Sequence, residues 1–246
     1  IGNNGWSHYS TCPSHMTALG LQEIDLHGHK GNSDINHEEC TMKGCRVWTN
    51  HGRSTIKTRC IAAPKGAVKD APRIRARANG WSGYSTCPRG YRAAGLQYMD
   101  NHGNRHNADL NHKECTQHGC RVWMEGATAT IGTRCVKHSV FDIKDGPRIR
   151  TPKNTWSPYS NCPHGFQAVG LAYMDLHGNR HNSDINHRQC TMRGCRVWTE
   201  GYYATIAHVD MRFGRWQQIA DREFIGDPAF MPVSHAMHHQ ARAVAL

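Results

Sequence analysis

Residues 156–198 read WSPYSNCPHGFQAVGLAYMDLHGNRHNSDINHRQCTMRGCRVW, and closely similar stretches occur twice more in the chain. The other copies begin at Trp6 and Trp81, so each copy starts 75 residues after the one before. A fixed period of this kind is the signature of a repeat architecture. The sequence therefore predicts three repeats, at 1–75, 76–150 and 151–225, and a C-terminal tail at 226–246. The third repeat diverges from the others after about residue 206.

Short alternating segments fit these repeats better than helices, because no stretch of about 10–12 residues shows a clean helical period. Residues 45–49 and 55–58 are predicted strands, and residues 50–52 between them suit a hairpin turn. About four such strands are expected in each repeat. The predicted fold is all-β, with three tandem repeats of short antiparallel strands in a pseudo-threefold, β-prism-like arrangement stapled by disulfides. A trefoil-like barrel and three separate beads fit the pattern as well.

The cysteines follow the repeat with the spacing C-x27-C-x4-C-x14-C. An even number per repeat is typical of a disulfide framework, although spacing alone leaves the pairing open. The third repeat reads TIAHVD at 205–210, where the first two read TIKTRC and TIGTRC, so its last cysteine is missing. One thiol there is expected to be free or to join two chains. The predicted disulfide cysteines are Cys12, Cys40, Cys45, Cys60, Cys87, Cys115, Cys120, Cys135, Cys162, Cys190 and Cys195.

Zinc is the alternative use of these cysteines, because structural zinc takes four nitrogen and sulfur ligands. The spacing differs from the usual paired C-x2-C knuckles, and the first cysteine of each repeat would be left over. Disulfides are therefore favoured, and they imply an extracellular or lumenal setting. The alternative zinc sets would be His37, Cys40, Cys45 and Cys60 in the first repeat, and His112, Cys115, Cys120 and Cys135 in the second.

A polar loop also recurs, reading DLHGHKGNSDINH at 25–37 in the first repeat. Carboxylate and amide groups can bind the hydroxyls of a glycan. A carboxylate–amide cluster could also hold Ca²⁺, and the histidines could instead bind Zn²⁺ or Cu²⁺, but no metal or cofactor is expected. The structural interpretation is that these residues cap turns through their own backbone. The repeated tryptophans are expected to belong to the core more than to ligand platforms. The candidate ligand-binding residues are His27, Asn32, Asp34, Asn36, His102, Asn107, Asp109, Asn111, His177, Asn182, Asp184 and Asn186.

The pattern W-x-x-Y-x-x-C-P-x-G-x-x-A-x-G-L, followed by D-x-N-H-x-x-C, resembles the vitelline membrane outer layer protein family. Copy one departs from it at Ser14 and His15, where the glycine turn is missing. The resemblance implies a β-prism of three Greek-key sheets and a secreted, egg-coat or glycan-associated role. The matching residues are Trp81, Cys87, Pro88, Gly90, Gly95, Leu96, Asp109, Asn111 and Cys115, and Trp156, Cys162, Pro163, Gly165, Gly170, Leu171, Asp184, Asn186 and Cys190.

The charge of the chain points to polyanionic partners. The 246 residues carry 30 Lys and Arg against 19 Asp and Glu, a formal net charge of +11. Arginines cluster in the connectors at 73–77 and 148–150. No apolar run reaches the roughly 18–20 residues of a membrane span, and no nucleic-acid recognition module is visible.

The chain shows none of the common catalytic motifs, and triplicated loops suit multivalent binding better than catalysis. The expected function is therefore that of a secreted, non-enzymatic, lectin-like protein. It would bind glycans or anionic extracellular polymers through three equivalent loops. The alternatives are a self-assembling building block of an extracellular coat, matrix or filament, and an intracellular zinc-binding repeat protein.

Overall fold

The computed structural model describes residues 5–27, 34–50, 53–102, 109–177, 184–201 and 203–213. Every regular element in this part of the chain is a strand, which confirms the predicted all-β class. Residues 1–212 form one compact unit, and the second unit, 213–246, lies almost wholly outside the described residues. The predicted tail at 226–246 is among the residues not described. Within the described ranges, no helix has the length and apolar character needed to cross a membrane.

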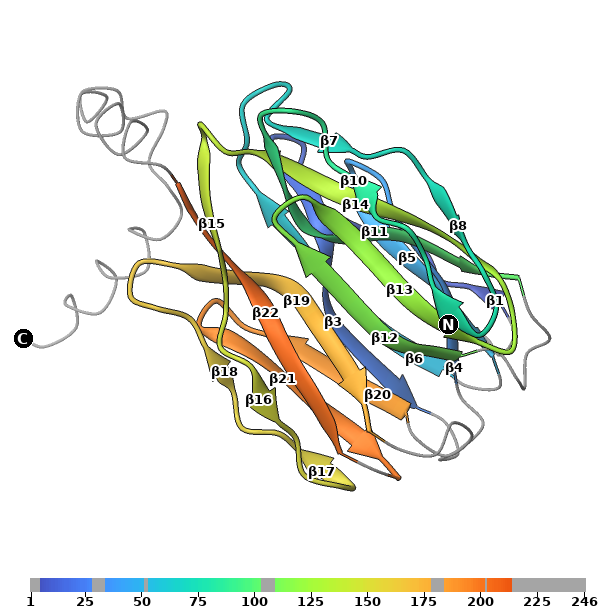
Figure 1. Cartoon of the computed structure of the whole chain (residues 1–246). Helices are drawn as coiled ribbons and strands as arrows, with labels where there is room; N and C mark the ends of the chain where they lie inside the picture. The colour runs from blue at the N-terminus through green and yellow to red at the C-terminus, as the bar shows by residue number, and fades with distance from the viewer. Residues whose placement is uncertain are drawn as a thin grey trace, which may run out of the picture. The chain divides into compact units, whose positions relative to one another are not determined.

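Each repeat contributes four principal strands, as the alternating pattern predicts (Figure 1). The divergence after residue 206 does not end the pattern, because the last principal strand continues to Phe213. The principal strands are β3 (Thr17–His27), β4 (Asp34–Cys40), β5 (Gly44–Asn50) and β6 (Arg53–Ile61); β11 (Tyr91–Asn101), β12 (Asp109–Thr116), β13 (Gly119–Glu125) and β14 (Ala129–Lys137); and β19 (Gln167–Leu176), β20 (Asp184–Cys190), β21 (Gly194–Glu200) and β22 (Ala204–Phe213).

Short strands accompany them at the sheet edges and in the connectors. They are β1 (Gly5–Trp6), β2 (Ser10–Thr11), β7 (Val68–Asp70), β8 (Ile74–Ala76), β9 (Gly80–Trp81), β10 (Ser85–Thr86), β15 (Phe141–Asp145), β16 (Ile149–Arg150), β17 (Thr155–Trp156) and β18 (Ser160–Asn161).

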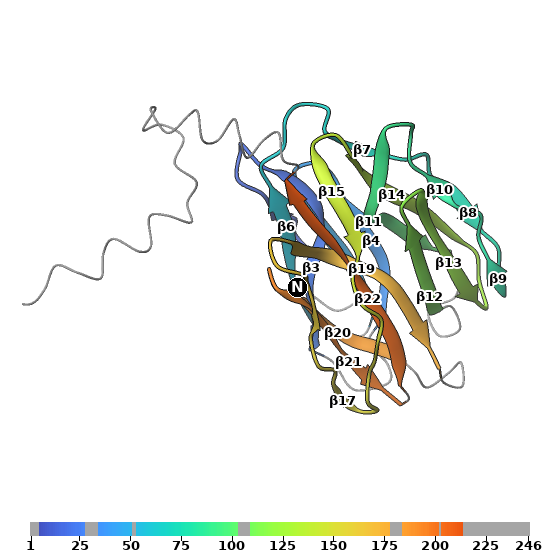
Figure 2. The ribbon, with the colours of Figure 1, turned by 60° about the vertical axis from the view of Figure 1, so that its left-hand side comes forward.

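Every sheet is shared between two repeats. The first sheet has the order β1-β5-β4-β11-β14-β7, and the second has the order β10-β13-β12-β19-β22-β15. The third sheet, β17-β21-β20-β3-β6, joins the last repeat back to the first. The three repeats therefore form a closed ring of three sheets, which fits the prism-like arrangement and not three separate beads (Figures 1 and 2).

The predicted hairpin across residues 50–52 is wrong. Strand β5 lies in the first sheet and β6 lies in the third, and β13 and β14 are likewise in different sheets. The reason is that β5 already pairs with β4 on one side and with β1 and β2 on the other, so β6 has no free edge of β5 to join. The hairpin of each repeat is instead formed by the two strands before this crossover, such as β4 and β5.

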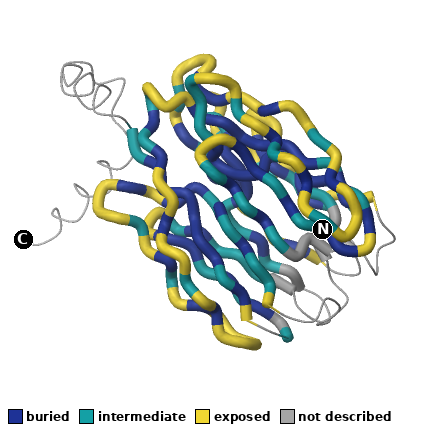
Figure 3. The backbone as a smooth tube through the Cα atoms, in the orientation of Figure 1, coloured by how far each residue is buried: buried dark blue, intermediate teal, exposed yellow. Residues whose placement is uncertain are grey.

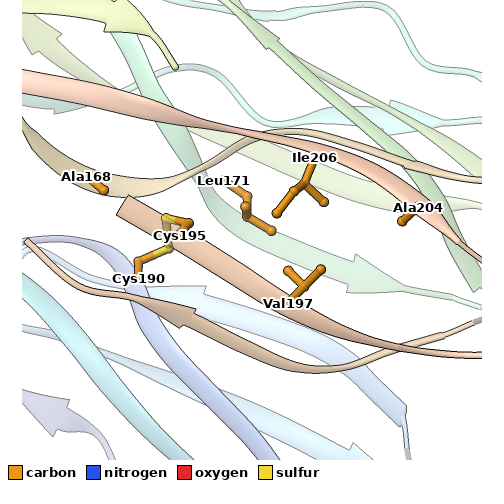
Figure 4. Packing of buried hydrophobic residues seen from close by; sticks show 7 residues of the cluster. All are labelled: Ala168, Leu171, Cys190, Cys195, Val197, Ala204 and Ile206. Atoms are coloured by element: carbon orange, nitrogen blue, oxygen red, sulfur yellow. A yellow bond between two sulfur atoms is a disulfide. The ribbon is translucent and has the colours of Figure 1, made fainter. Parts of the chain in front are cut away.

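The core lies between the sheets, where β3, β11 and β19 contact one another. Buried positions run along the principal strands, and exposed positions gather in the loops and edge segments (Figure 3). One apolar cluster brings the second and third sheets together (Figure 4). Its members are Ala168, Leu171, Cys190, Cys195, Val197, Ala204 and Ile206.

Charged side chains also enter this interior at equivalent repeat positions. Glu38, Lys113 and Arg188 are each 75 residues apart, and Arg188 Nη2 lies 3.9 Å from Glu38 Oε2. Burial lowers the pKa of Lys113 to about 7, the nearby Arg188 adds to the effect, and Glu38 opposes it. The interior thus holds one acidic and two basic groups at three positions that the repeat makes equivalent.

The disulfides follow two patterns. Cys40–Cys45, Cys115–Cys120 and Cys190–Cys195 each close the hairpin of a repeat. Cys12–Cys60 ties the first sheet to the third, and Cys87–Cys135 ties the second to the first. Cys162 is free. The alternative zinc sets are therefore wrong, because their cysteines are bonded to one another or to the first cysteine of the repeat.

Candidate ligand-binding clusters at the repeat junctions

Polar and aromatic side chains gather on the faces of the sheets that point away from the core, where two repeats meet. The first meeting point is the pairing of β4 with β11, in which His37 stands opposite Asp100. The other two are the pairings of β12 with β19 and of β20 with β3, which place His112 opposite Asp175 and His187 opposite Asp25. Because the sheets are shared between repeats, each histidine belongs to one repeat and its aspartate belongs to the next.

Each histidine lies at ion-pair distance from its aspartate. The Nδ1–Oδ1 distances are 2.6 Å for His37 and Asp100, 2.6 Å for His112 and Asp175, and 2.5 Å for His187 and Asp25. The side chains are partly exposed, although Nδ1 of His37 and Nδ1 of His187 are themselves buried.

A tryptophan lies on either side of the histidine. The ring centroid of His37 lies 5.6 Å from that of Trp6 and 5.5 Å from that of Trp48, in tilted and edge-on arrangements. The first tryptophan of each repeat is exposed, with 41% of Trp6, 41% of Trp81 and 36% of Trp156 accessible. The expectation that the repeated tryptophans belong to the core is therefore wrong for these three residues. They sit in two-residue edge strands.

An arginine covers each exposed tryptophan. The guanidinium carbon of Arg46 lies 4.3 Å from the centroid of Trp6 and 4.8 Å from that of Tyr9. Arg46 also donates to Glu39, 2.7 Å from its Nε, and Tyr9 donates to the same carboxylate oxygen. Burial opposes ionisation of Glu39, but these two hydrogen bonds and the charge of Arg46 hold the pKa of Glu39 below its usual value. The arginine is thus fixed by its neighbours while its cationic group remains near the surface.

We call these sets the junction clusters. The first consists of Trp6, Arg46, His37, Trp48 and Asp100; the second of Trp81, Arg121, His112, Trp123 and Asp175; and the third of Trp156, Arg196, His187, Trp198 and Asp25.

The connector arginines complete two of the three clusters. Arg73 stacks 3.5 Å from the centroid of Tyr98, whose hydroxyl donates to Asp100, and Arg148 stacks 3.9 Å from that of Tyr173. In the first repeat the position of Tyr98 is occupied by Glu23. The first and second junction clusters therefore carry one more arginine than the third.

Two of the predicted loop residues join the junction clusters. Nδ1 of His102 lies 3.9 Å from Asp100, and Nε2 of His177 lies 3.8 Å from Asp175, so each aspartate has a histidine on either side. The Nε2 atoms of His102 and His177 also lie 2.8 Å from Thr130 and Thr205. The side chains of the other ten predicted ligand-binding residues lie outside the described part of the chain. These residues are His27, Asn32, Asp34, Asn36, Asn107, Asp109, Asn111, Asn182, Asp184 and Asn186.

Sequence reasoning placed the site in the loops and missed the aromatic and arginine residues beside it. Trp6 and Arg46 were both visible as residues retained in all three copies. The pairing of β4 with β11 that brings Asp100 to them was not visible, because nothing in the repeat says which copy supplies the neighbouring strand. No protein-family model matches the chain, and no curated protein matches it.

Proposed function

We propose that this protein is a non-catalytic, multivalent binding protein that recognises glycans or other anionic extracellular polymers through its three junction clusters. One observation gives the proposal its main support. An exposed tryptophan held beside an arginine, a histidine and an aspartate recurs at all three places where the repeats meet. This set offers an aromatic face for a sugar ring, a cation for a sulfate or carboxylate, and acceptors for hydroxyls.

Charge and valency support the same function. A net charge of +11 attracts polyanions over long range. Three similar sites on one compact unit let a polymer bind several of them at once, so that weak individual contacts sum to useful avidity. The five disulfides are typical of the oxidising environment in which extracellular proteins fold. A secreted protein of the egg-coat type, as the sequence resemblance implies, would meet such polymers.

The experiment uses the full chain, a panel of immobilised neutral and sulfated glycans, and heparin as the polyanionic probe. The test variant replaces the three exposed tryptophans together, as Trp6→Ala, Trp81→Ala and Trp156→Ala. Tyr203→Ala is the matched control, because Tyr203 is an exposed aromatic stacked under Arg150 outside the junction clusters. Retention of the wild-type circular dichroism spectrum shows that the fold is intact.

Wild-type protein should bind with an affinity that falls as salt rises, and the triple variant should lose at least about tenfold in affinity, since avidity multiplies the three losses. The control should bind like the wild type. Equal binding by the triple variant would overturn the assignment to the junction clusters. A concentration-dependent polymer with no glycan affinity would contradict the binding function and favour the coat building block instead.

A further inference from the structure

The third repeat departs from the other two at the disulfide that joins neighbouring sheets. Cys12 and Cys87 bond to cysteines 48 residues further on, but the residue 48 positions after Cys162 is Asp210. Two residues earlier, the first two repeats carry Thr58 and Thr133, and the third carries a histidine. The lost disulfide is therefore replaced by two new polar residues at the same place in the fold.

These residues converge on Cys162. The Nε2 atom of His208 lies 3.4 Å from Cys162 Sγ and 2.7 Å from Asp210 Oδ1. One ligand atom from each of the three residues lies within 4.8 Å of the others. His208 and Asp210 are fully buried, and Cys162 is partly exposed. Neither carboxylate oxygen of Asp210 accepts a hydrogen bond of good geometry from the described residues, although His208 Nε2 is in contact.

The hydrogen bonds of Ser160 determine which nitrogen of His208 faces this cluster with a lone pair. Ser160 Oγ donates its single proton to the carbonyl of Pro147, at 2.7 Å, so it must accept from His208 Nδ1, at 2.9 Å. In the neutral imidazole Nε2 then carries no proton, and its lone pair points at a thiol and a carboxylate. Metal-binding histidines show the same arrangement, in which the second ring nitrogen donates to a fixed acceptor.

A third change makes room for His208. The connector before the third repeat reads KDGPRIR, where the connector before the second reads KDAPRIR. A Cβ at Gly146 would collide with the His208 ring, 2.6 Å from both of its nitrogens. Gly146 has no left-handed backbone conformation that would require glycine. The exchange of Ala71 for Gly146 therefore matches the exchange of threonine for histidine. The site combines changes in two separate segments with Cys162, which is retained from the other repeats.

The geometry differs from that of a nucleophilic triad. In a Cys-His-Asp relay the thiol and the carboxylate contact opposite nitrogens of the imidazole, so that a proton can pass between them. Here both contact Nε2, and Nδ1 is occupied by Ser160. Ser160 is itself buried and bonded to the backbone, as Ser85 is at the same position in the second repeat. Convergence of three ligand atoms on one point is what a metal ion requires.

We propose that Cys162, His208 and Asp210 bind a divalent transition-metal ion, with Zn²⁺ as the preferred ion. Sulfur, imidazole nitrogen and carboxylate oxygen are the three ligand types that Zn²⁺ takes in proteins, and three protein ligands leave a fourth position for water. The ion's charge would compensate the buried carboxylate of Asp210 and the thiolate that Cys162 becomes on binding. Binding releases the thiol proton to solvent, because the thiolate is the form that coordinates the metal.

The experiment must distinguish this site from the other histidines, of which the chain has 19. A thiol-specific signal does so, because Cys162 is the one free cysteine. Co²⁺ is added to the full-length oxidised protein as a spectroscopic probe, and the thiolate-to-cobalt charge-transfer band is followed. In parallel, alkylation of Cys162 is timed with and without one equivalent of Zn²⁺.

Wild-type protein should give the charge-transfer band at one equivalent of Co²⁺, and Zn²⁺ should abolish it and slow alkylation at least about tenfold. Asp210→Asn keeps the shape of the side chain and removes its charge, so it should weaken Zn²⁺ binding by at least about tenfold. The matched control is the triple variant Gly146→Ala, His208→Thr and Asp210→Cys, which carries the residues of the second repeat. It should form the third long-range disulfide and give no band.

Two results would overturn the proposal. One is an alkylation rate that Zn²⁺ leaves unchanged in wild-type protein whose five disulfides are intact. The other is a Co²⁺ spectrum without a thiolate band. Either result would mean that Cys162 does not coordinate a metal ion in this cluster. A Cys162-linked dimer as the main species in freshly folded protein would also contradict a metal-bound thiol.

Discussion

Nδ1 of His37 lies 2.6 Å from Oδ1 of Asp100, and the two residues belong to different repeats that meet at the pairing of β4 with β11. The same contact closes the ring, because His187 of the last repeat faces Asp25 of the first. A side-chain pair that lies in a candidate binding cluster is therefore also a contact between repeats. Substitutions there should affect both stability and binding, and the measurements must separate the two.

The first prediction concerns the strength of the His37–Asp100 contact. Both side chains are partly exposed, so the coupling free energy should be modest, about 0.5–1 kcal/mol. A double-mutant cycle with His37→Gln and Asp100→Asn, followed by urea denaturation at neutral pH, measures it. Additive effects of the two substitutions would show that the contact contributes nothing to stability.

The second prediction concerns Arg134, which is fully buried and joins the second repeat to the first. It donates to the carbonyls of Ala18 and Cys40, at 2.9 and 2.6 Å, and its Nε lies 3.0 Å from Asp70. Arg134→Met should lower the free energy of unfolding by about 3–5 kcal/mol, because the carboxylate and the carbonyls lose their partner. Arg212→Met is the control.

Arg212 forms an ion pair with Asp142, but both side chains are about one-third exposed. Its loss should cost no more than about 1 kcal/mol. If urea denaturation shows similar losses of unfolding free energy for Arg134→Met and Arg212→Met, then burial does not make Arg134 the more important of the two.

The third prediction is a pH dependence of stability caused by Lys113. Burial lowers its pKa in the folded protein to about 7, whereas in the unfolded chain it should titrate near 10.4. Between these values the unfolded state binds the additional proton, so Lys113 makes the free energy of unfolding rise with pH above about 7. Below pH 7 both states are protonated and the destabilisation is constant.

Lys113→Met should therefore stabilise the protein most at pH 6. Its advantage over the wild type should shrink between pH 7 and pH 9, with a slope of up to about 1.4 kcal/mol per pH unit. Guanidinium denaturation of both proteins at pH 6, 7, 8 and 9 measures this difference, and the comparison cancels all groups that the two proteins share. A constant difference over this range would rule out a depressed pKa for Lys113.

The fourth prediction separates the two kinds of disulfide. Cys87–Cys135 closes a loop across 48 positions, and Cys115–Cys120 closes one across five. The chain-entropy relation gives about 4 kcal/mol for the long loop and about 2 kcal/mol for the short one. Paired alanine substitutions at each bond, compared by thermal unfolding, should therefore show the larger loss for the long-range disulfide. A larger loss for Cys115–Cys120 would mean that this bond stabilises the folded protein directly and not mainly by restricting the unfolded chain.

The fifth prediction tests the match between Gly146 and His208. Gly146→Ala alone should destabilise the protein by about 1–3 kcal/mol, because the new methyl group has no space beside the imidazole. Adding His208→Thr should recover most of this loss, since Ala71 lies against Thr133 at the equivalent place in the first sheet. Urea denaturation of the single and double variants measures the recovery. No recovery in the double variant would show that the two positions are independent.

The sequence was sufficient to predict local structure in this chain, but not the pairing between repeats. The 75-residue period and the alternating segments predict four principal strands in each repeat, and the structure has them. The same signals also suggest a hairpin across residues 50–52, which is wrong. A strand's alternation records which face is buried and does not record which neighbour donates its hydrogen bonds. That choice depends on contacts between residues far apart in the chain.

The candidate sites, too, could be predicted from the sequence only in part. The predicted loop residues His102 and His177 do lie at the junction clusters. However, the histidine that pairs with the aspartate beside each of them, His37 or His112, comes from the preceding repeat. The metal site was more accessible to sequence reasoning. The missing cysteine in TIAHVD, the histidine beside it and the change from KDAPRIR to KDGPRIR stand in the sequence as separate features. Comparing the copies position by position would have connected all three changes.

The sharing of every sheet between two repeats has a consequence for shortened forms of the chain. A fragment ending near residue 150 would keep β3 without its neighbour β20, and β12 without its neighbour β19. These two exposed edges are complementary, because β3 occupies in the first repeat the place of β19 in the third. Such a fragment should not remain a smaller closed ring. Copies of it should associate through these two edges, and the third repeat is what pairs both edges within one chain.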